Sequence, residues 1–556
     1  HVKRHSFPTR RSSDLLGVVL AVVGAALLAG PLMGAAAGLV PTRRGIAWRH
    51  FFYVGARNLA RSAITAAYQF SQLALQAALF AHAIAVTLGR LRSGHGLLEW
   101  TTAAQAQASA WDGPTAFVRG HTRMVAACVL LAGASLAGPH PLAGFTLFAL
   151  WALAPLIAWR ASRAPQADTA AALPGADQAH LLTLARDTWR YFERCVTPQD
   201  NHLPPDNLQM VPEPMLAHRT SPTNIGLYLL GAACAREFGW ISTDELARRL
   251  HATLDTMERL PKHQGHLLNW YDTQTLQVLA PAYVSTVDSG NLAGLLLAVA
   301  QACMDLATRE GHSQDQQHTL VALAVRCRAL FAGMDFSGLY DRRRHLFHIG
   351  LRVEENVLDA SHYDLLASES RLTSLLAIAK GDVPQRHWQA LGRPFLTAGV
   401  VPGLKSWSGS MFEYLMPALL MPEPAHGLLA EACRAAVAEQ RAFGQQTGLP
   451  WGVSESAYFA QDHSLAFQYS PFGVPRLALR RTPPADRVVA PYATAMALQF
   501  DPQAASDNLR RLETLGARGD MGFYEAVDFT TLRQPEVQAF SLVEAFMAHH
   551  QGMTLA

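Results

Sequence analysis

Hydrophobic and polar positions divide the chain into two parts that meet near residue 160. Before that point, apolar residues run together in three uncharged stretches, over residues 15–40, 63–89 and 124–159. Each exceeds the ~20 apolar residues that a membrane-spanning helix needs, so transmembrane helices are expected within residues 16–160. The third stretch is interrupted by Gly-Pro-His-Pro at 138–141, which predicts either one long span or a re-entrant pair. The alternative is that these stretches are buried helices of a soluble protein.

Beyond an Ala- and Pro-rich linker over residues 161–177, helical patterns alternate with long polar loops. Ser242 and Glu245 have the spacing of a capping box, and an apolar face that begins at Leu246 follows them. About twelve such patterns over residues 178–556, paired through polar loops, suggest an all-α fold, an (α/α)6 toroid preceded by transmembrane helices. Helices are expected near residues 178–195, 222–237, 292–306, 315–333, 363–380, 427–445, 488–498, 502–515 and 537–556.

Charge and cysteine content exclude several classes of function. The formal net charge of +3 is too small to indicate nucleic-acid binding. Six cysteines are scattered without a CxxC pair, which argues against a zinc site or a disulfide framework and suits a reducing compartment. Arginines crowd the connections on both sides of the second apolar stretch, so charge leaves the membrane orientation undecided. Residues 1–15 contain SFPTRRSSDL, which looks like translated adapter sequence, and we expect them to be non-native.

Three strings between residues 219 and 294 hold more aromatic, amide and carboxylate side chains than helix connections require. They read RTSPTNIGLYLL (219–230), GHLLNWYDT (265–273) and YVSTVDSGNLAG (283–294). Aromatic rings cover the C–H faces of a sugar while amides and carboxylates bind its hydroxyls, so this composition is typical of a carbohydrate-binding surface. Alternatively, the rings are core residues and the polar groups hold loops. The candidate substrate-binding residues here are Arg219, Asn224, Trp270, Tyr271, Asp272, Asp288 and Asn291.

Glycoside chemistry needs two carboxylates beside the scissile bond, and later polar strings supply candidates. Glu369 lies in SHYDLLASESRLTS, Glu413 in SMFEY and Glu455 in LPWGVSESAYF. Each of them could instead be a helix cap or half of an ion pair. Metal ligands on one helical face favour i,i+4 spacing, which the adjacent His549 and His550 lack, so no metal site is expected. Further candidate substrate-binding residues are Trp407, Trp451, Tyr458, Glu525, His549, His550 and Gln551.

These strings resemble the middle, glycoamylase-like region of the cyclic β-1,2-glucan synthases. The resemblance continues through YDLLASESRLTSLLAIAKGDVP, SWSGSMFEYLMP, FQYSPFGVPRL, VVAPYATAMAL, GFYEAVDFT and MAHHQGM, and covers residues 178–556. GLLEWTTAAQA (96–106) resembles the end of the membrane glycosyltransferase region of the same synthases, whose nucleotide-sugar-binding core would lie upstream. The resemblance implies a fragment of a larger protein and supports the toroid over residues 178–556.

The resemblance also implies a transglycosylase that cuts within linear β-1,2-glucan and joins the new reducing end of one segment to its own non-reducing end. Because the broken and formed bonds are both β, two inversions are needed, which indicates a retaining mechanism with a covalent glycosyl-enzyme. Carried over by motif, Glu455 looks like the nucleophile and Glu369 the acid/base, with Glu413 in reserve for either role. Crowded aromatics near these residues would keep water away from the intermediate.

By the same resemblance, the toroid needs no cofactor, whereas UDP-glucose and a divalent metal belong to the upstream transferase core. The expected partners are linear β-1,2-glucan, membrane lipid, and the upstream transferase and downstream phosphorylase-like domains of the same protein, without nucleic acid. The expected location is the bacterial inner membrane, multi-pass, with the toroid in the cytoplasm. Two alternatives remain for the function: an endo-β-1,2-glucanase that hydrolyses the polymer, and a non-catalytic module that holds it.

Overall fold

The computed structural model describes residues 48–96, 113–163, 173–396, 401–480, 485–535 and 538–556, together with part of residues 18–33. The chain divides into two compact units, His1–Thr169 and Ala170–Ala556. This division falls within the predicted linker over residues 161–177. The proposed non-native residues 1–15 lie outside the described residues, as does the 96–106 string apart from Gly96.

The first unit contributes two candidate membrane spans within the part of the chain that the structure describes. Helix α3 is long and apolar enough to cross a membrane, and α7 and α8 meet the same criteria together as a pair bent by 44°. Residues 124–159 do not form one straight span, because α6 ends before the Gly138-Pro139 turn and α7 packs back against it. The predicted stretch over residues 15–40 is largely outside the description. The helices here are α2 (Trp48–Ser71), α3 (Leu73–Ser93), α5 (Pro114–Gly120), α6 (Thr122–Ser135), α7 (Pro141–Ala152) and α8 (Ala154–Ser162).

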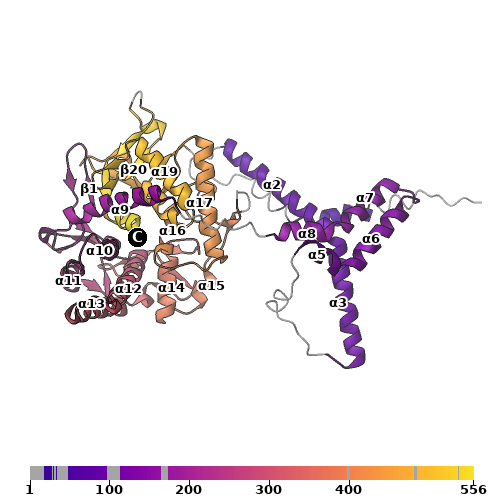
Figure 1. The fold of residues 1–556 in the computed structure, drawn as a ribbon, viewed down its shortest axis with the longest axis horizontal. Helices are drawn as coiled ribbons and strands as arrows, with labels where there is room; N and C mark the ends of the chain where they lie inside the picture. The colour runs from indigo at the N-terminus through magenta and orange to yellow at the C-terminus, as the bar shows by residue number, and fades with distance from the viewer. Residues whose placement is uncertain are drawn as a thin grey trace, which may run out of the picture. The chain divides into compact units, whose positions relative to one another are not determined.

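The second unit is an α/α toroid, in which the chain passes once around a ring of helices (Figure 1). Alternate helices form the inner wall: α10 contacts α12, α12 contacts α14, α16 contacts α18, and α18 contacts α20. The last helix, α20, closes the ring against α9 and α10. The helices are α9 (Gly175–Cys195), α10 (Pro222–Glu237), α11 (Thr243–Arg259), α12 (Thr286–Thr308), α13 (Gln314–Gly333), α14 (Arg371–Lys380), α15 (Arg386–Ala390), α16 (Met411–Leu415), α17 (Leu428–Thr447), α18 (Pro491–Met496), α19 (Pro502–Thr514) and α20 (Ala548–Leu555), with 3-10 turns at Pro198–Asp200, Phe336–Leu339, Pro417–Leu419, Ala497–Gln499 and Thr531–Arg533.

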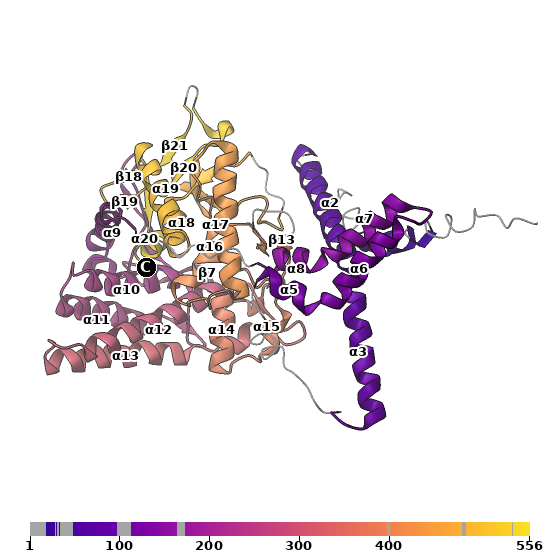
Figure 2. The same ribbon diagram turned by 45° about the vertical axis from the view of Figure 1, so that its right-hand side comes forward.

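Apolar pattern decides which helices are inner and which are outer. In α11, Leu246, Leu250 and Leu254 are fully buried on one face and charged residues occupy the other, so it packs on the outside. Helix α12 is apolar nearly all round and long enough to span a membrane, yet two-thirds of its apolar window is buried inside the toroid between α10, α13 and α14. Figure 2 shows α11, α12 and α13 side by side. The predicted capping box forms only in part: Ser242 accepts the Glu245 N–H, while the Glu245 carboxylate binds arginines.

Short antiparallel sheets occupy the loops between these helices. The largest has the order β11-β10-β7-β6-β3, and three three-stranded sheets have the orders β2-β1-β22, β12-β9-β8 and β17-β20-β21. The strands are β1 (Asn207–Gln209), β2 (Met215–Leu216), β3 (Arg219–Thr220), β4 (Lys262–His263), β5 (His266–Leu267), β6 (Asn269–Asp272), β7 (Val278–Ser285), β8 (Tyr340–Asp341), β9 (Leu346–His348), β10 (Gly350–Arg352), β11 (Val357–Leu358), β12 (His362–Tyr363), β13 (Phe395–Leu396), β14 (Gly403–Leu404), β15 (Ser456–Gln461), β16 (Phe467–Ser470), β17 (Val488–Val489), β18 (Arg518–Gly519), β19 (Gly522–Phe523), β20 (Ala526–Asp528), β21 (Ser541–Val543) and β22 (Ala545–Met547).

Candidate active site

Glu413 organises the loop that carries SWSGS. Its carboxylate accepts hydrogen bonds from Ser406 Oγ at 2.8 Å, Ser408 Oγ at 2.5 Å and the backbone N–H groups of Trp407 at 3.1 Å and Ser410 at 3.2 Å. Glu413 also forms a capping box with Ser410 at the start of α16. Because loop donors engage both carboxylate oxygens, this geometry favours a positioning role over the catalytic role that the sequence held in reserve.

Glu455 lies directly before β15 and is held through its backbone by the same loop. Its N–H donates to Ser410 Oγ at 3.1 Å, and its carbonyl accepts from the Tyr492 hydroxyl at 2.8 Å. The side chain of Glu455 in turn accepts a hydrogen bond from the Tyr469 hydroxyl on the paired strand β16. The backbone is thereby fixed, while the carboxylate faces a tyrosine.

Glu369 lies in the turn between β12 and α14. Within the described part of the chain its carboxylate has no hydrogen-bond partner, although the residue is half-buried. The neighbouring Ser368 and Ser370 bond to each other, at 3.2 Å between their hydroxyls. Glu369 thus differs from Glu413, because its oxygens are not committed to holding the fold.

Burial and neighbouring charges raise the pKa of both glutamates, and the charge of Glu455 acts on Glu369. Burial raises the pKa of Glu369 well above its ordinary value, and the charges of Glu455, Asp288 and Glu413 raise it further. Burial raises the pKa of Glu455 to about 7, opposed by the hydrogen bond from Tyr469, which stabilises the ionised form. Both carboxyl groups therefore hold a proton more readily than an exposed glutamate does, and Glu455 has a hydrogen bond that opposes this rise in its pKa.

Asp288 joins this group from the first turn of α12. Its carboxylate accepts from Thr223 Oγ1 at 2.6 Å and from Asn269 Nδ2 at 2.9 Å. Asn291, one turn further along α12, donates to Thr223 Oγ1 at 3.3 Å. All three polar strings therefore meet at Asp288, as a binding surface requires.

A second polar cluster surrounds Asp206, which the sequence did not single out. The buried Asp206 carboxylate accepts from Arg219 Nε at 3.2 Å and from Asn224 Nδ2 at 3.0 Å. The Arg219 guanidinium also lies 5.4 Å above the ring centroid of Trp270. Arg219, Asn224 and Trp270 are thus brought together, with Asn224 held in place by Asp206.

The C-terminal helix supplies a buried Glu–His pair. His550 Nδ1 lies 2.9 Å from both oxygens of Glu525, and the Tyr492 ring stacks on His550 with 3.6 Å between centroids. Burial raises the pKa of Glu525 to about 8 and lowers that of His550 well below its ordinary value, so a protonated acid meets a neutral imidazole. His549 lies 3.4 Å from the Tyr469 hydroxyl, and burial lowers its pKa to about 3.

Two of the predicted aromatic contacts remain available to a ligand. Trp407 is 46% exposed, and its indole N–H donates to Asp364 Oδ1 at 2.8 Å, which fixes the plane of the ring. Tyr458 is half-buried on β15, with the Arg533 guanidinium 4.9 Å from its ring centroid. An exposed, oriented ring of this kind is what sugar stacking needs.

Four of the residues predicted to bind substrate make structural contacts instead. Tyr271 is fully buried, and its hydroxyl donates to the Pro261 carbonyl, so it is a core residue. Trp451 is packed in the second hydrophobic core and bound through its backbone to Asn508. Asp272 caps a turn by accepting hydrogen bonds from the N–H groups of Gln274 and Thr275. Gln551 is buried and donates a hydrogen bond to the Phe523 carbonyl.

Sequence reasoning missed three tyrosines that interact with the glutamates, two by hydrogen bonds and one electrostatically. Tyr469 and Tyr492 contact Glu455 directly, and Glu369 raises the pKa of Tyr363, which burial has already raised. The strings FQYSPFGVPRL and VVAPYATAMAL carry Tyr469 and Tyr492, so their motifs were visible. What the sequence lacked was any indication that these strings converge on one glutamate.

Two family models match the chain, both within the second unit. Residues 361–556 match the Glycoamylase family model, described as "Putative glucoamylase", and residues 183–291 match DUF3131, a family of unknown function. The cyclic β-(1,2)-glucan synthase NdvB of Rhizobium meliloti (strain 1021) is 36% identical over 95% of this chain. The chain spans 23% of the length of that protein.

Solved structures share the fold of the second unit at low identity. An endo-β-1,2-glucanase from Chitinophaga pinensis superposes with a TM-score of 0.54 at 16% identity, covering 69% of this chain and 92% of that one. A second such enzyme, from Talaromyces funiculosus, gives 0.56 at 14% identity over 68% of this chain and 83% of its own. A putative glucoamylase from Bacteroides caccae gives 0.54 at 16% identity, over 68% and 92%. The chain is therefore a relative of the cyclic β-(1,2)-glucan synthases that corresponds to one section of them and carries a glycoamylase-like toroid.

Proposed function

We propose that the toroid cleaves linear β-1,2-glucan and closes the released segment into a ring by retaining transglycosylation, as part of a cyclic β-1,2-glucan synthase. The observation that carries the proposal is that Glu369 and Glu455, which come from different loops, interact electrostatically: the charges of Glu455 and Asp288 raise the pKa of Glu369. The similarity to a cyclic β-(1,2)-glucan synthase, and a fold shared with endo-β-1,2-glucanases, support the choice of polymer.

The different environments of the two glutamates support their separate roles. Glu369 has the higher pKa and no hydrogen bond that would favour ionisation, so it suits the acid that protonates the leaving oxygen. Glu455 receives the Tyr469 hydrogen bond, which favours the carboxylate, so it suits the nucleophile that attacks the anomeric carbon. After the first step Glu369 is the base that deprotonates the attacking hydroxyl of the glucan's own non-reducing end.

Positioning groups complete the proposed site. Glu413 orders the SWSGS loop, and Ser410 transmits that order to the backbone of Glu455. Trp407 and Tyr458 offer aromatic faces to sugar rings, while Asp288 and Arg219 offer polar contacts. The reaction assigns no cofactor to the toroid, because carboxyl groups supply both the nucleophile and the proton.

The first unit is proposed as a membrane anchor. Helix α3 and the α7–α8 pair are apolar and long enough to span a bilayer. We propose that the protein lies in the bacterial inner membrane, with the toroid on the cytoplasmic side. There, the upstream transferase of the same protein, which would use UDP-glucose and a divalent metal, would supply the linear glucan.

A substrate assay tests the polymer specificity. The purified chain in detergent is incubated with linear β-1,2-glucan or with starch, and cleavage is followed by size-exclusion chromatography of the products. We expect β-1,2-glucan to be shortened and the starch profile to stay unchanged. The fold shared with glucoamylases does not imply action on starch, because a fold does not fix the substrate. Release of glucose from starch with no change in β-1,2-glucan would refute the proposal.

The pH profile of cleavage is expected to be bell-shaped, with Glu455 setting the acid limb. Cleavage needs ionised Glu455 and protonated Glu369, so the rate falls as pH decreases through about 7 and again as pH rises through the higher pKa of Glu369. Tyr469→Phe removes the hydrogen bond that lowers the pKa of Glu455, so the acid limb should move to higher pH. A profile of kcat/KM against pH measures this shift.

The matched control for this profile is Tyr524→Phe, a half-buried tyrosine whose ring packs on Phe546. It should keep the wild-type acid limb. An acid limb that stays in place in Tyr469→Phe would show that Tyr469 does not set the ionisation of Glu455.

A further inference from the structure

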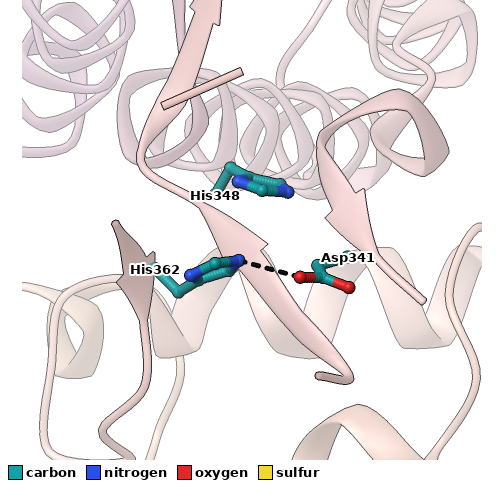
Figure 3. A group of neighbouring side chains, drawn as sticks. All are labelled: Asp341, His348 and His362. Atoms are coloured by element: carbon teal, nitrogen blue, oxygen red, sulfur yellow. Dashed lines mark hydrogen bonds and ion pairs between the residues drawn. The ribbon is translucent and has the colours of Figure 1, made fainter. Parts of the chain in front are cut away.

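Three side chains with metal-ligating atoms meet on the small sheet β12-β9-β8 (Figure 3). Asp341 lies on β8, His348 on β9 and His362 on β12, and one ligand atom from each lies within 4.8 Å of the other two. The register pairs His362 with His348 directly across the β12–β9 ladder, so the two imidazoles project from the same face. Their ring centroids are 4.3 Å apart.

Hydrogen bonds orient two of these groups so that a lone pair remains for a ligand. The His348 Nδ1 atom lies 2.6 Å from the Asp359 carbonyl, which can only accept, so Nδ1 carries the proton and Nε2 has a free lone pair. Asp341 Oδ1 accepts from the N–H groups of Arg343 at 2.8 Å and Arg344 at 3.1 Å, which leaves Oδ2 facing His362. A histidine that donates its other ring N–H to a carbonyl is the usual arrangement at metal sites.

We propose that Asp341, His348 and His362 form a binding site for a divalent transition-metal ion of the Zn²⁺ type. Two imidazole nitrogens and one carboxylate oxygen suit Zn²⁺ and similar ions, whereas Ca²⁺ and Mg²⁺ prefer oxygen ligands alone. Water fills the fourth position of a tetrahedral ion. His362 Nε2 now lies 3.1 Å from Asp341 Oδ2, and on binding it ligates through this nitrogen while its proton moves to Nδ1 or to solvent.

The position of the ion gives it a structural effect on the proposed catalytic loop. His362 is followed by Tyr363 at the end of β12, and the chain then enters the turn that carries Glu369. Strand β12 is only two residues long, so a metal link from His362 to β8 and β9 would hold the start of this turn more firmly than the ladder alone. The inference stands on these three side chains and does not depend on the substrate proposed for the toroid.

The test is a Zn²⁺ titration of the whole chain in detergent. The protein is stripped with a chelator, dialysed, and titrated with ZnCl₂ by isothermal calorimetry. Affinity in the micromolar range or tighter is expected, together with a loss of at least about tenfold in His348→Ala and in Asp341→Asn. Free cysteines also bind zinc, so the site is defined by the binding that disappears in these two variants.

The matched control is His218→Ala. His218 forms the same kind of His–Asp contact, 2.7 Å between Nδ1 and Asp200 Oδ1, and it belongs to no such three-ligand group among the described residues. Its Zn²⁺ affinity should equal that of the wild type. An unchanged isotherm in His348→Ala, or no difference between His348→Ala and His218→Ala, would overturn the metal site.

A gain-of-signal variant separates metal binding from misfolding. His348→Cys keeps a ligand at the same place on β9, so it should retain Zn²⁺ binding and, with Co²⁺, develop a thiolate-to-cobalt absorption band that the wild type lacks. Far-ultraviolet circular dichroism checks that each variant is folded. A folded His348→Cys protein without the new band would contradict the proposal, because the ion would then not touch position 348.

Discussion

Glu455→Gln is expected to abolish both cleavage and cyclisation of β-1,2-glucan, with a loss on the order of 10⁴-fold or more. Glutamine preserves the shape of the side chain but removes the charge that attacks the anomeric carbon. The backbone contacts of Glu455 to Ser410 and Tyr492 do not involve the carboxylate, so the variant should fold normally. Initial rates of formation of cyclic and shortened glucans, measured by chromatography of the products, give the size of the loss.

Glu369→Gln should lose about 10²–10⁴-fold, the usual contribution of proton transfer. A β-glucosyl substrate whose leaving group needs no protonation should restore the first step in Glu369→Gln and not in Glu455→Gln. Azide should then trap the glycosyl-enzyme of Glu369→Gln as a β-azide, and give an α-azide with a Glu455→Ala variant, in which it takes the place of the nucleophile. The reverse pattern of anomers would exchange the two roles.

Glu193→Gln is the control for loss of a carboxylate charge in the same unit. Glu193 pairs with Arg186 within α9, at 2.7 Å, and has no contact with the proposed site among the described residues. Its activity should match that of the wild type. Near-normal cyclisation by Glu455→Gln or Glu369→Gln, beside an active control, would rule out the assignment.

The second large effect is expected on stability, from Arg371→Met. Arg371 is 1% exposed and donates to the carbonyls of Glu413 at 2.9 Å and Tyr414 at 2.6 Å, and to the carboxylate of Glu423 at 3.3 Å. Methionine would leave these buried acceptors unpaired, which costs about 3–5 kcal/mol of unfolding free energy. Urea unfolding followed by tryptophan fluorescence measures the change.

Two comparisons show whether this cost comes from the buried pair. Adding Glu423→Gln to Arg371→Met should recover part of the loss, because it removes the unpaired charge. Arg248→Met, at an exposed arginine that pairs with Glu245, should cost no more than about 1 kcal/mol. An Arg371→Met cost as small as that of Arg248→Met would mean that Arg371 does not tie α14 to α16.

The helices were predictable because their patterns are local. The ranges 178–195, 222–237 and 502–515 agree with α9, α10 and α19 to within a few residues. The differences lie where the chain approaches the site. Helix α14 begins at Arg371 rather than near 363, because β12 and the turn with Glu369 precede it. Helix α20 begins at Ala548 rather than near 537, because β21 and β22 occupy the residues before it. Long-range strand pairing leaves little trace in a helical pattern.

Residue type alone could not separate binding side chains from structural ones. Trp407 and Trp451 are both tryptophans in polar, Gly-containing strings, yet one is exposed and the other is buried in the core. Glu413 and Glu369 are both glutamates near a helix start, and only the hydrogen bonds show that Glu413 is committed to its loop. Contacts between distant segments decide these cases, and a single sequence does not contain them.

The mass of the product formed from linear β-1,2-glucan shows whether the toroid cyclises its substrate or hydrolyses it. The purified chain in detergent is incubated with the polymer, and the products are analysed by mass spectrometry and for reducing ends. We expect cyclic glucans, each lighter by one water than the linear chain of the same length and without a reducing end, and we expect Glu455→Gln to form none. Only linear oligosaccharides, with a new reducing end for every cut, would contradict cyclisation and identify a hydrolase.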